Sequence, residues 1–119
     1  HQCIVLRQNE SAYGNWRFSR GKQTETVKVQ GKLSTNDGEV ALNWALNGHG
    51  ILMRAEWDVA KYLRSGRLER VLADYDTMPA DIHAVYPERL SLSAKVSCFV
   101  EHLRNYLSQH ADGPGQSKW

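Results

Sequence analysis

The sequence predicts an α/β fold built around a parallel sheet, and three observations support this prediction. Short apolar runs at 3–7, 51–53 and 68–73 have the pattern of strands that are buried on both faces. Between these runs, apolar residues recur at helical spacing, first after residue 38 and again after residue 58. The connections are only a few residues long, and strands that alternate with helices across short connections are typical of a parallel sheet.

Composition and charge restrict the class of protein. The 119 residues are 41% hydrophobic and 24% charged, with a net charge of +2, which predicts one ordinary soluble domain. The apolar runs fall short of the ~20 residues that span a bilayer, and no signal-peptide pattern is present. We therefore expect a cytoplasmic protein without a membrane partner. Because the chain meets the apolar run 3–6 almost at once, we also expect a piece of a longer protein.

The first elements are predicted from alternating and continuous apolar patterns. Residues 3–7 indicate a buried strand, and the polar segment 8–15 indicates a loop. Residues 16–18 and 24–33 alternate between apolar and polar side chains around a glycine turn, which predicts a hairpin-like pair of strands. Five basic residues belong to this hairpin, and a solvated face is favoured for them over contact with DNA. They are Arg17, Arg20, Lys22, Lys28 and Lys32.

The middle of the chain predicts a strand–helix–strand–helix–strand succession. The first helix starts at 36–38, where Asp37 can cap the free backbone amides, and it stops at Gly48. After a short strand at 51–53, Asp58 is expected to cap the second helix, and Gly66 is a suitable residue to end it. Residues 68–73 are expected to return as a strand.

The last third predicts one strand and the clearest helix in the chain. Segment 75–81 contains Pro79 and indicates a linker, and 82–86 indicates a strand that Pro87 ends. Ser91 or Ser93 can cap the final helix, whose apolar positions recur every three or four residues. These positions are Val96, Phe99, Val100, Leu103 and Leu107. The Gly- and Pro-rich segment 111–119 is expected to be a disordered tail.

The division into parts follows from how much surface each part can bury. One strand and one helix bury too little apolar surface to form a core alone. We therefore expect residues 82–110 to complete a first lobe whose other strands come from elsewhere, and residues 1–74 to form most of a second lobe. Segment 75–81 would link or cross between them.

Seven pieces of sequence, in order, resemble the C-terminal part of a LysR-type transcriptional regulator. They are Cys3–Arg7, Trp16–Phe18, Asn36–Gly38, Gly48–Ile51, Leu63–Leu72, Ala84–Pro87, and Leu92–Val96 with Phe99 and Val100. The resemblance extends to about residue 107. It implies a two-lobed effector-binding domain similar to type 2 periplasmic binding proteins, here represented by lobe two and the C-terminal strand and helix of lobe one.

The same resemblance implies a function. In this family a small-molecule effector binds in the cleft between lobes. Its binding changes how dimers or tetramers hold a separate N-terminal winged helix-turn-helix domain on DNA, and that domain lies outside this chain. The alternative function is a small-molecule carrier of the periplasmic-binding type with no role at DNA.

Candidate effector-binding residues follow from where ligands bind in α/β sheets, which is outside the carboxyl ends of the strands. The candidates are Arg7, Gln8, Thr35, Asn36, Asp37, Met53, Arg54, Ala55 and Trp57. Arg7 and Arg54 could hold an anionic effector, since a guanidinium binds a carboxylate through two hydrogen bonds. A solvated or salt-bridged arginine is an equal alternative for each. Ala55 stands where the family often has proline, and for Trp57 core packing is favoured over a place in the pocket.

The residues of reactive type have simpler structural interpretations. His49 lies between two glycines and is assigned to a helix C-terminus rather than to catalysis or metal binding. Asp37 is favoured as a helix cap over a general base. Cys3 and Cys98 stand far apart in apolar segments and are expected to be buried free thiols. We therefore expect no catalytic residue, metal or cofactor, and a protein that is not an enzyme.

Overall fold

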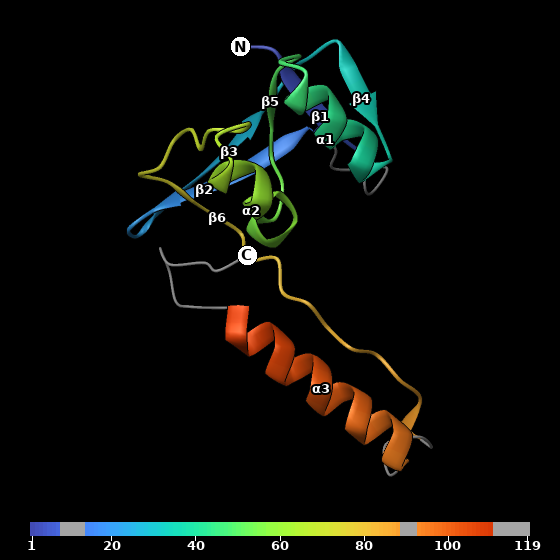
Figure 1. Cartoon of the computed structure of the whole chain (residues 1–119). Coiled ribbons are helices and arrows are strands. Elements are labelled where there is room, and N and C mark those ends of the chain that lie inside the picture. Colours follow the sequence, from blue (N-terminus) through green and yellow to red (C-terminus); the bar gives the residue numbers. More distant parts are fainter. Residues whose placement is uncertain (8–13, 89–92, 111–119) are drawn as a thin grey trace. The chain divides into compact units, whose positions relative to one another are not determined.

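The computed structural model describes residues 1–7, 14–88 and 93–110, with side chains described as far as Ser108. The chain separates into two compact units, His1–Pro79 and Ala80–Trp119, and each is described by itself. The first unit holds a parallel sheet, an antiparallel sheet and two helices. The described elements of the second unit consist mainly of one long helix (Figure 1).

The parallel sheet of the first unit has β1 (Cys3–Leu6) at its centre. It lies between β4 (Leu33–Thr35) and β5 (Ile51–Leu52), and both pairings are parallel, with Ile4 opposite Leu33 on one side and Leu52 on the other. Ile4 and Val5 leave only 1% and 6% of their surfaces exposed. Because consecutive side chains of a strand point to opposite faces, both faces of β1 are covered. The predicted α/β fold with a parallel sheet is confirmed.

Helix α1 (Gly38–Leu46) packs on all three parallel strands through Ala41 and Leu42, which are buried. Its start is the predicted one, since the Asp37 side chain accepts hydrogen bonds from the first-turn amides. Gly48 ends the helix with a positive φ of 77° and donates its N–H to the carbonyl of Ala45. His49 donates its N–H to the carbonyl of Trp44 and is exposed, so its predicted place at a helix C-terminus is confirmed.

Helix α2 (Glu56–Arg64) begins earlier than predicted. Its N-cap is Ala55, which makes no side-chain cap bond, and Asp58 lies inside the first turn. The prediction that Asp58 caps this helix is therefore wrong, because its carboxylate binds Arg54. The predicted end is confirmed, since Gly66 has a φ of 71° and donates its N–H to the carbonyl of Leu63.

The second sheet of this unit is antiparallel and contains the predicted hairpin. β2 (Asn15–Arg20) pairs with β3 (Gln23–Lys28) across a two-residue turn that starts at Gly21, with a φ of 59°. β6 (Asp76–Thr77), which lies in the segment interpreted as a linker, adds to the other side of β2. The basic residues of the hairpin segment are exposed.

Two predicted strand boundaries in this unit are wrong. The strand expected at 24–33 ends at Lys28, because Gln30 instead accepts a hydrogen bond from the Cys3 amide and Leu33 starts β4 beside β1. The strand expected at 68–73 does not form. Leu72 has a left-handed φ of 56°, and Val71 and Leu72 leave 51% and 58% of their surfaces exposed. A positive φ lies outside the range of a β-strand, and the carbonyl of Leu72 instead accepts the Tyr75 amide in a turn.

Helix α3 (Ala94–His110) is the main described element of the second unit and confirms the predicted final helix. Val96, Val100, Leu103 and Leu107 are half-buried on it, whereas Phe99 leaves 62% of its surface exposed. Ser93 accepts the Ser97 amide through its carbonyl, and Ser91 lies outside the described residues. The described helices include none that is long and apolar enough to cross a membrane.

The strand predicted at 82–86 is wrong. These residues are exposed, Val85 at 93%. An extended segment becomes a strand only when another strand satisfies its backbone amides and carbonyls, and among the described residues none pairs with it. Both cysteines are free, as predicted, but Cys98 is exposed and Cys3 is half-buried, so the expected burial is wrong for Cys98. Residues 111–119, the expected tail, lie outside the described residues.

Candidate functional site

The predicted binding edge is built by the carboxyl ends of the three parallel strands. Arg7 follows β1, Thr35 ends β4 and Met53 follows β5, and parallel strands bring these positions to one edge of the sheet. The Arg7 amide donates to the Thr35 carbonyl over 2.7 Å, which extends the pairing of β1 and β4 to the edge itself. We call residues 7, 35–37 and 53–55 the carboxyl edge.

On the β4 side, the carboxyl edge is a tight turn into α1. The Thr35 hydroxyl accepts the Asp37 amide over 3.0 Å, and Oδ1 of Asp37 accepts the amides of Glu39 over 2.8 Å and Val40 over 3.2 Å. These bonds satisfy amides that have no partner within the helix. Asp37 thus has a structural role, and Asn36 is exposed beside it.

We expect Asp37→Ala to lower the free energy of unfolding by about 1 kcal/mol, because two first-turn amides lose their acceptor. Asp37→Asn should retain most of the stability, since the amide oxygen can accept the same bonds. Chemical denaturation of both variants measures this difference. Equal stability of the alanine variant and the wild type would contradict the capping role.

On the β5 side, Arg54 forms an ion pair with Asp58 four residues later. Nε of Arg54 donates to Oδ2 of Asp58 over 2.7 Å, and Nη2 contacts the same oxygen. The two side chains leave only 20% and 24% of their surfaces exposed. The sequence left open an anion-binding arginine and a solvated or salt-bridged one, and the structure contains the Arg54–Asp58 salt bridge, while a role of Arg54 in binding an effector stays a prediction.

The Arg54 guanidinium also lies against the start of α1. A Cβ placed on Gly38 would come within 2.6 Å of Nη1 and 2.9 Å of Cζ of Arg54. Gly38 therefore makes room for the guanidinium, which connects the beginning of α1 with the first turn of α2. The contact depends on the absence of a side chain at position 38, a signal that sequence patterns alone do not reveal.

The other predicted residues differ in exposure. Arg7 is exposed, and Met53 and Ala55 are half-buried. Trp57 leaves 44% of its surface exposed, so core packing does not describe it. Gln8 lies outside the described residues. The structure thus brings together residues 7, 35–37 and 53–55 through the backbone of one sheet.

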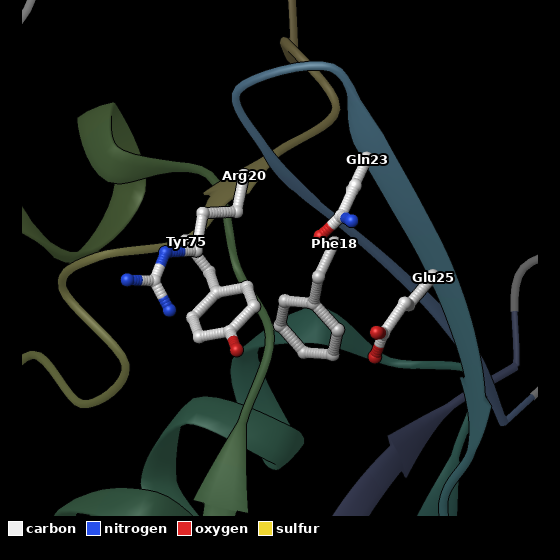
Figure 2. Close-up of a pocket in the computed structure, with 5 residues that line it drawn as sticks. All are labelled: Phe18, Arg20, Gln23, Glu25 and Tyr75. Atoms are coloured by element: carbon white, nitrogen blue, oxygen red, sulfur yellow. The ribbon is translucent and has the colours of Figure 1, made fainter.

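A hollow that sequence reasoning missed lies on the hairpin (Figure 2). It is lined by Phe18, Arg20, Gln23, Glu25 and Tyr75. The Phe18 and Tyr75 rings meet edge to face with centroids 6.3 Å apart, and the Arg20 guanidinium lies 5.7 Å from the Tyr75 ring centre. Strand alternation places Phe18 and Arg20 on one face, but the contribution of Tyr75 depends on a distant turn and could not be inferred.

The aromatic contacts of this hollow continue along β2 from Phe18 to Trp16. The Trp16 and Phe18 rings also meet edge to face, with centroids 6.5 Å apart. Such pairs add stability beyond the area they bury, and the Phe18–Tyr75 pair adds to the backbone pairing of β6 with β2 that holds the preceding turn. Within residues 1–7, 14–88 and 93–110, no three His, Cys, Asp or Glu side chains gather as a metal ion would require.

Comparison with known proteins identifies the family. The model of the LysR substrate-binding domain matches residues 1–108. The chain belongs to the LysR substrate-binding domain family. This bears out the resemblance seen in the sequence, and the mixed α/β structure with its parallel sheet is compatible with such a domain.

Relatives of this LysR substrate-binding domain are named as transcriptional regulators. The HTH-type transcriptional activator TtdR of Escherichia coli strain 536 is 42% identical over 116 residues, which cover 98% of this chain and 37% of TtdR. The HTH-type transcriptional regulator DmlR of Escherichia coli K12 is 41% identical over 108 residues, 91% of this chain and 35% of DmlR. The chain thus spans little more than a third of the length of these relatives.

A third relative of the LysR substrate-binding domain differs in length. The putative LysR family substrate binding domain-containing protein YagP of Escherichia coli K12 is 27% identical over 112 residues, which cover 93% of this chain and 82% of YagP. It matches over most of its own length.

Proposed function

We propose that this chain is the ligand-sensing part of a LysR-type transcriptional regulator, which binds a small-molecule effector, changes the DNA binding of a dimer or tetramer, and catalyses no reaction. The effector binds in a cleft between two lobes, with residues 1–74 in lobe two and residues 82–110 completing lobe one across the segment 75–81. The regulator acts in the cytoplasm, and its DNA contacts come from a helix-turn-helix domain outside this chain.

One observation carries the proposed site: the Arg54 guanidinium stands at the carboxyl edge of the parallel sheet, packed on the glycine that starts α1. Edges of this kind are where open α/β sheets bind ligands. The cation supports an anionic effector, because a guanidinium presents paired donors to a carboxylate. Gln8 and Trp57 belong to the same proposed site. The names of the relatives support the regulatory role over that of a carrier.

The first test is a thermal-shift screen of the protein that carries this sequence, at the full length of its reading frame. Glutarate serves as the anionic probe and glutaramide as its neutral counterpart. We expect glutarate to raise the melting temperature and Arg54→Ala to abolish that rise, because the variant lacks the guanidinium that holds the carboxylate. The rise is measured against each protein's own melting temperature without ligand, because the loss of an ion pair that is about four-fifths buried also lowers stability.

Arg64→Ala is the matched control, because Arg64 is an exposed arginine in the last turn of α2, the helix that follows Arg54. It should leave the glutarate response intact. A glutarate response that survives Arg54→Ala removes Arg54 from the site. A DNA-binding assay then separates a sensor from a carrier, since only a sensor's effector changes the affinity for DNA.

A further inference from the structure

We propose that Asp58 is a specificity-determining residue of the carboxyl edge: as a built-in anion paired with Arg54, it weakens the binding of external anions and thereby sets the concentration at which they are sensed. This inference rests on the proposed function and adds a residue that was first interpreted only as a helix cap. It follows from the two sets of contacts that the guanidinium of Arg54 makes, one with the carboxylate of Asp58 and one with the start of α1.

The first step concerns the donors that Asp58 occupies. A guanidinium can present one pair of donors through Nε and one terminal nitrogen, and a second pair through its two terminal nitrogens. Oδ2 of Asp58 engages Nε over 2.7 Å and also Nη2, so the first pair is taken. Gly38 packs against the terminal part of the guanidinium, where a Cβ would lie 2.6 Å from Nη1 and 2.9 Å from both Cζ and Nη2, so the second pair has no carboxylate among the contacts described.

The second step concerns charge. A carboxylate that bound the terminal pair would lie only a few ångströms from the Asp58 carboxylate, in a place where both partners of the ion pair are about four-fifths buried. Like charges this close repel strongly when water screens them poorly. Asp58 therefore lowers the affinity of the site for an anionic effector. It lowers the affinity for a neutral ligand with a carbonyl oxygen much less.

The third step concerns geometry. The guanidinium is held both by Asp58 and by its packing on Gly38, whose missing side chain leaves the space for it. In Asp58→Asn, the amide oxygen of the new side chain can still accept from Nε, but the negative charge is gone. This substitution therefore removes the repulsion and keeps Arg54 in place, whereas Gly38→Ala keeps the charge and moves the guanidinium away.

The experiment measures the affinity of the full-length protein for glutarate and glutaramide by calorimetry. We expect Asp58→Asn to bind glutarate at least about fivefold more tightly, with little change for glutaramide. Glu56→Gln is the matched control, because it removes an equal charge from the exposed start of the same helix, and it should change the affinity less than about twofold. In the Arg54→Ala background, Asp58→Asn should have a much smaller effect.

Gly38→Ala supplies an independent arm that leaves every charge unchanged. The three atoms nearest the new methyl group all belong to the flexible end of Arg54, so the protein should fold, and its glutarate affinity should fall at least about fivefold. If glutarate binding needs Arg54 but Asp58→Asn changes it no more than Glu56→Gln does, the role of Asp58 is overturned and the proposed site stands. If neither the wild type nor any variant responds to glutarate, the anion site at Arg54 and the role of Asp58 both fail, and the DNA-binding assay alone tests the sensor.

Discussion

Ile4→Ala is expected to lower the free energy of unfolding of this chain by about 2–5 kcal/mol, because it removes a buried branched side chain from the centre of the parallel sheet. Ile4 leaves 1% of its surface exposed and is the largest fully buried side chain among the described residues. It stands in register with Leu33 of β4 and Leu52 of β5. The truncation would leave a cavity that neither flanking strand can fill without losing its backbone pairing.

Urea denaturation followed by circular dichroism measures this loss. Val27→Thr is a suitable control, because Val27 lies in a strand but leaves 44% of its surface exposed, and the change keeps a β-branched side chain. It should cost about 0.5 kcal/mol or less. Equal losses in the two variants would mean that Ile4 is not the centre of the core of this unit.

The elements that could be predicted from the sequence are those whose local signals agree with their surroundings. The run at β1, the cap at Asp37 and the glycines at 48 and 66 each have a physical reason that acts within a few residues. Segments 68–73 and 82–86 have apolar residues too, but a strand also needs a partner. Val71, Leu72 and Val85 are exposed, and no pattern within their own segments could have revealed this.

For the candidate site, the backbone positions could be predicted from the sequence, but the contacts of the side chains could not. The topology rule placed residues 7, 35–37 and 53–55 at one edge, and the strand pairing agrees with it. The Arg54–Asp58 pair was missed because the second helix was expected to begin at Asp58. Because the helix begins at Glu56, Asp58 lies in its first turn and can reach back four positions to Arg54. With that helix start, the spacing of four between the opposite charges predicts an ion pair.

Gly31→Ala is expected to cost about 3 kcal/mol of unfolding free energy or to prevent folding of the first unit, because the new Cβ would overlap backbone atoms that have nowhere to move. A Cβ at Gly31 would collide with the carbonyl oxygen of Cys3 and come within 2.7 Å of its carbonyl carbon. Cys3 begins β1, and its own amide donates to Gln30 over 3.2 Å. Relieving the collision therefore means breaking the approach of β4 to β1.

Gly50 lies close to the start of β1 on the side of β5, as Gly31 does on the side of β4. This second close approach supports the expected loss of stability. A Cβ there would come within 2.5 Å of the Gln2 carbonyl oxygen, the atom that accepts the Ile51 amide over 2.9 Å. The start of β1 is thus held between two glycines, one before β4 and one before β5, and the carboxyl edge depends on that register.

Gly21→Asn is the control, because Gly21 has open space around it and asparagine tolerates a positive φ. Thermal denaturation should show a large loss for Gly31→Ala and a small one for Gly21→Asn, and wild-type stability of Gly31→Ala would disprove the close approach of β4 to β1.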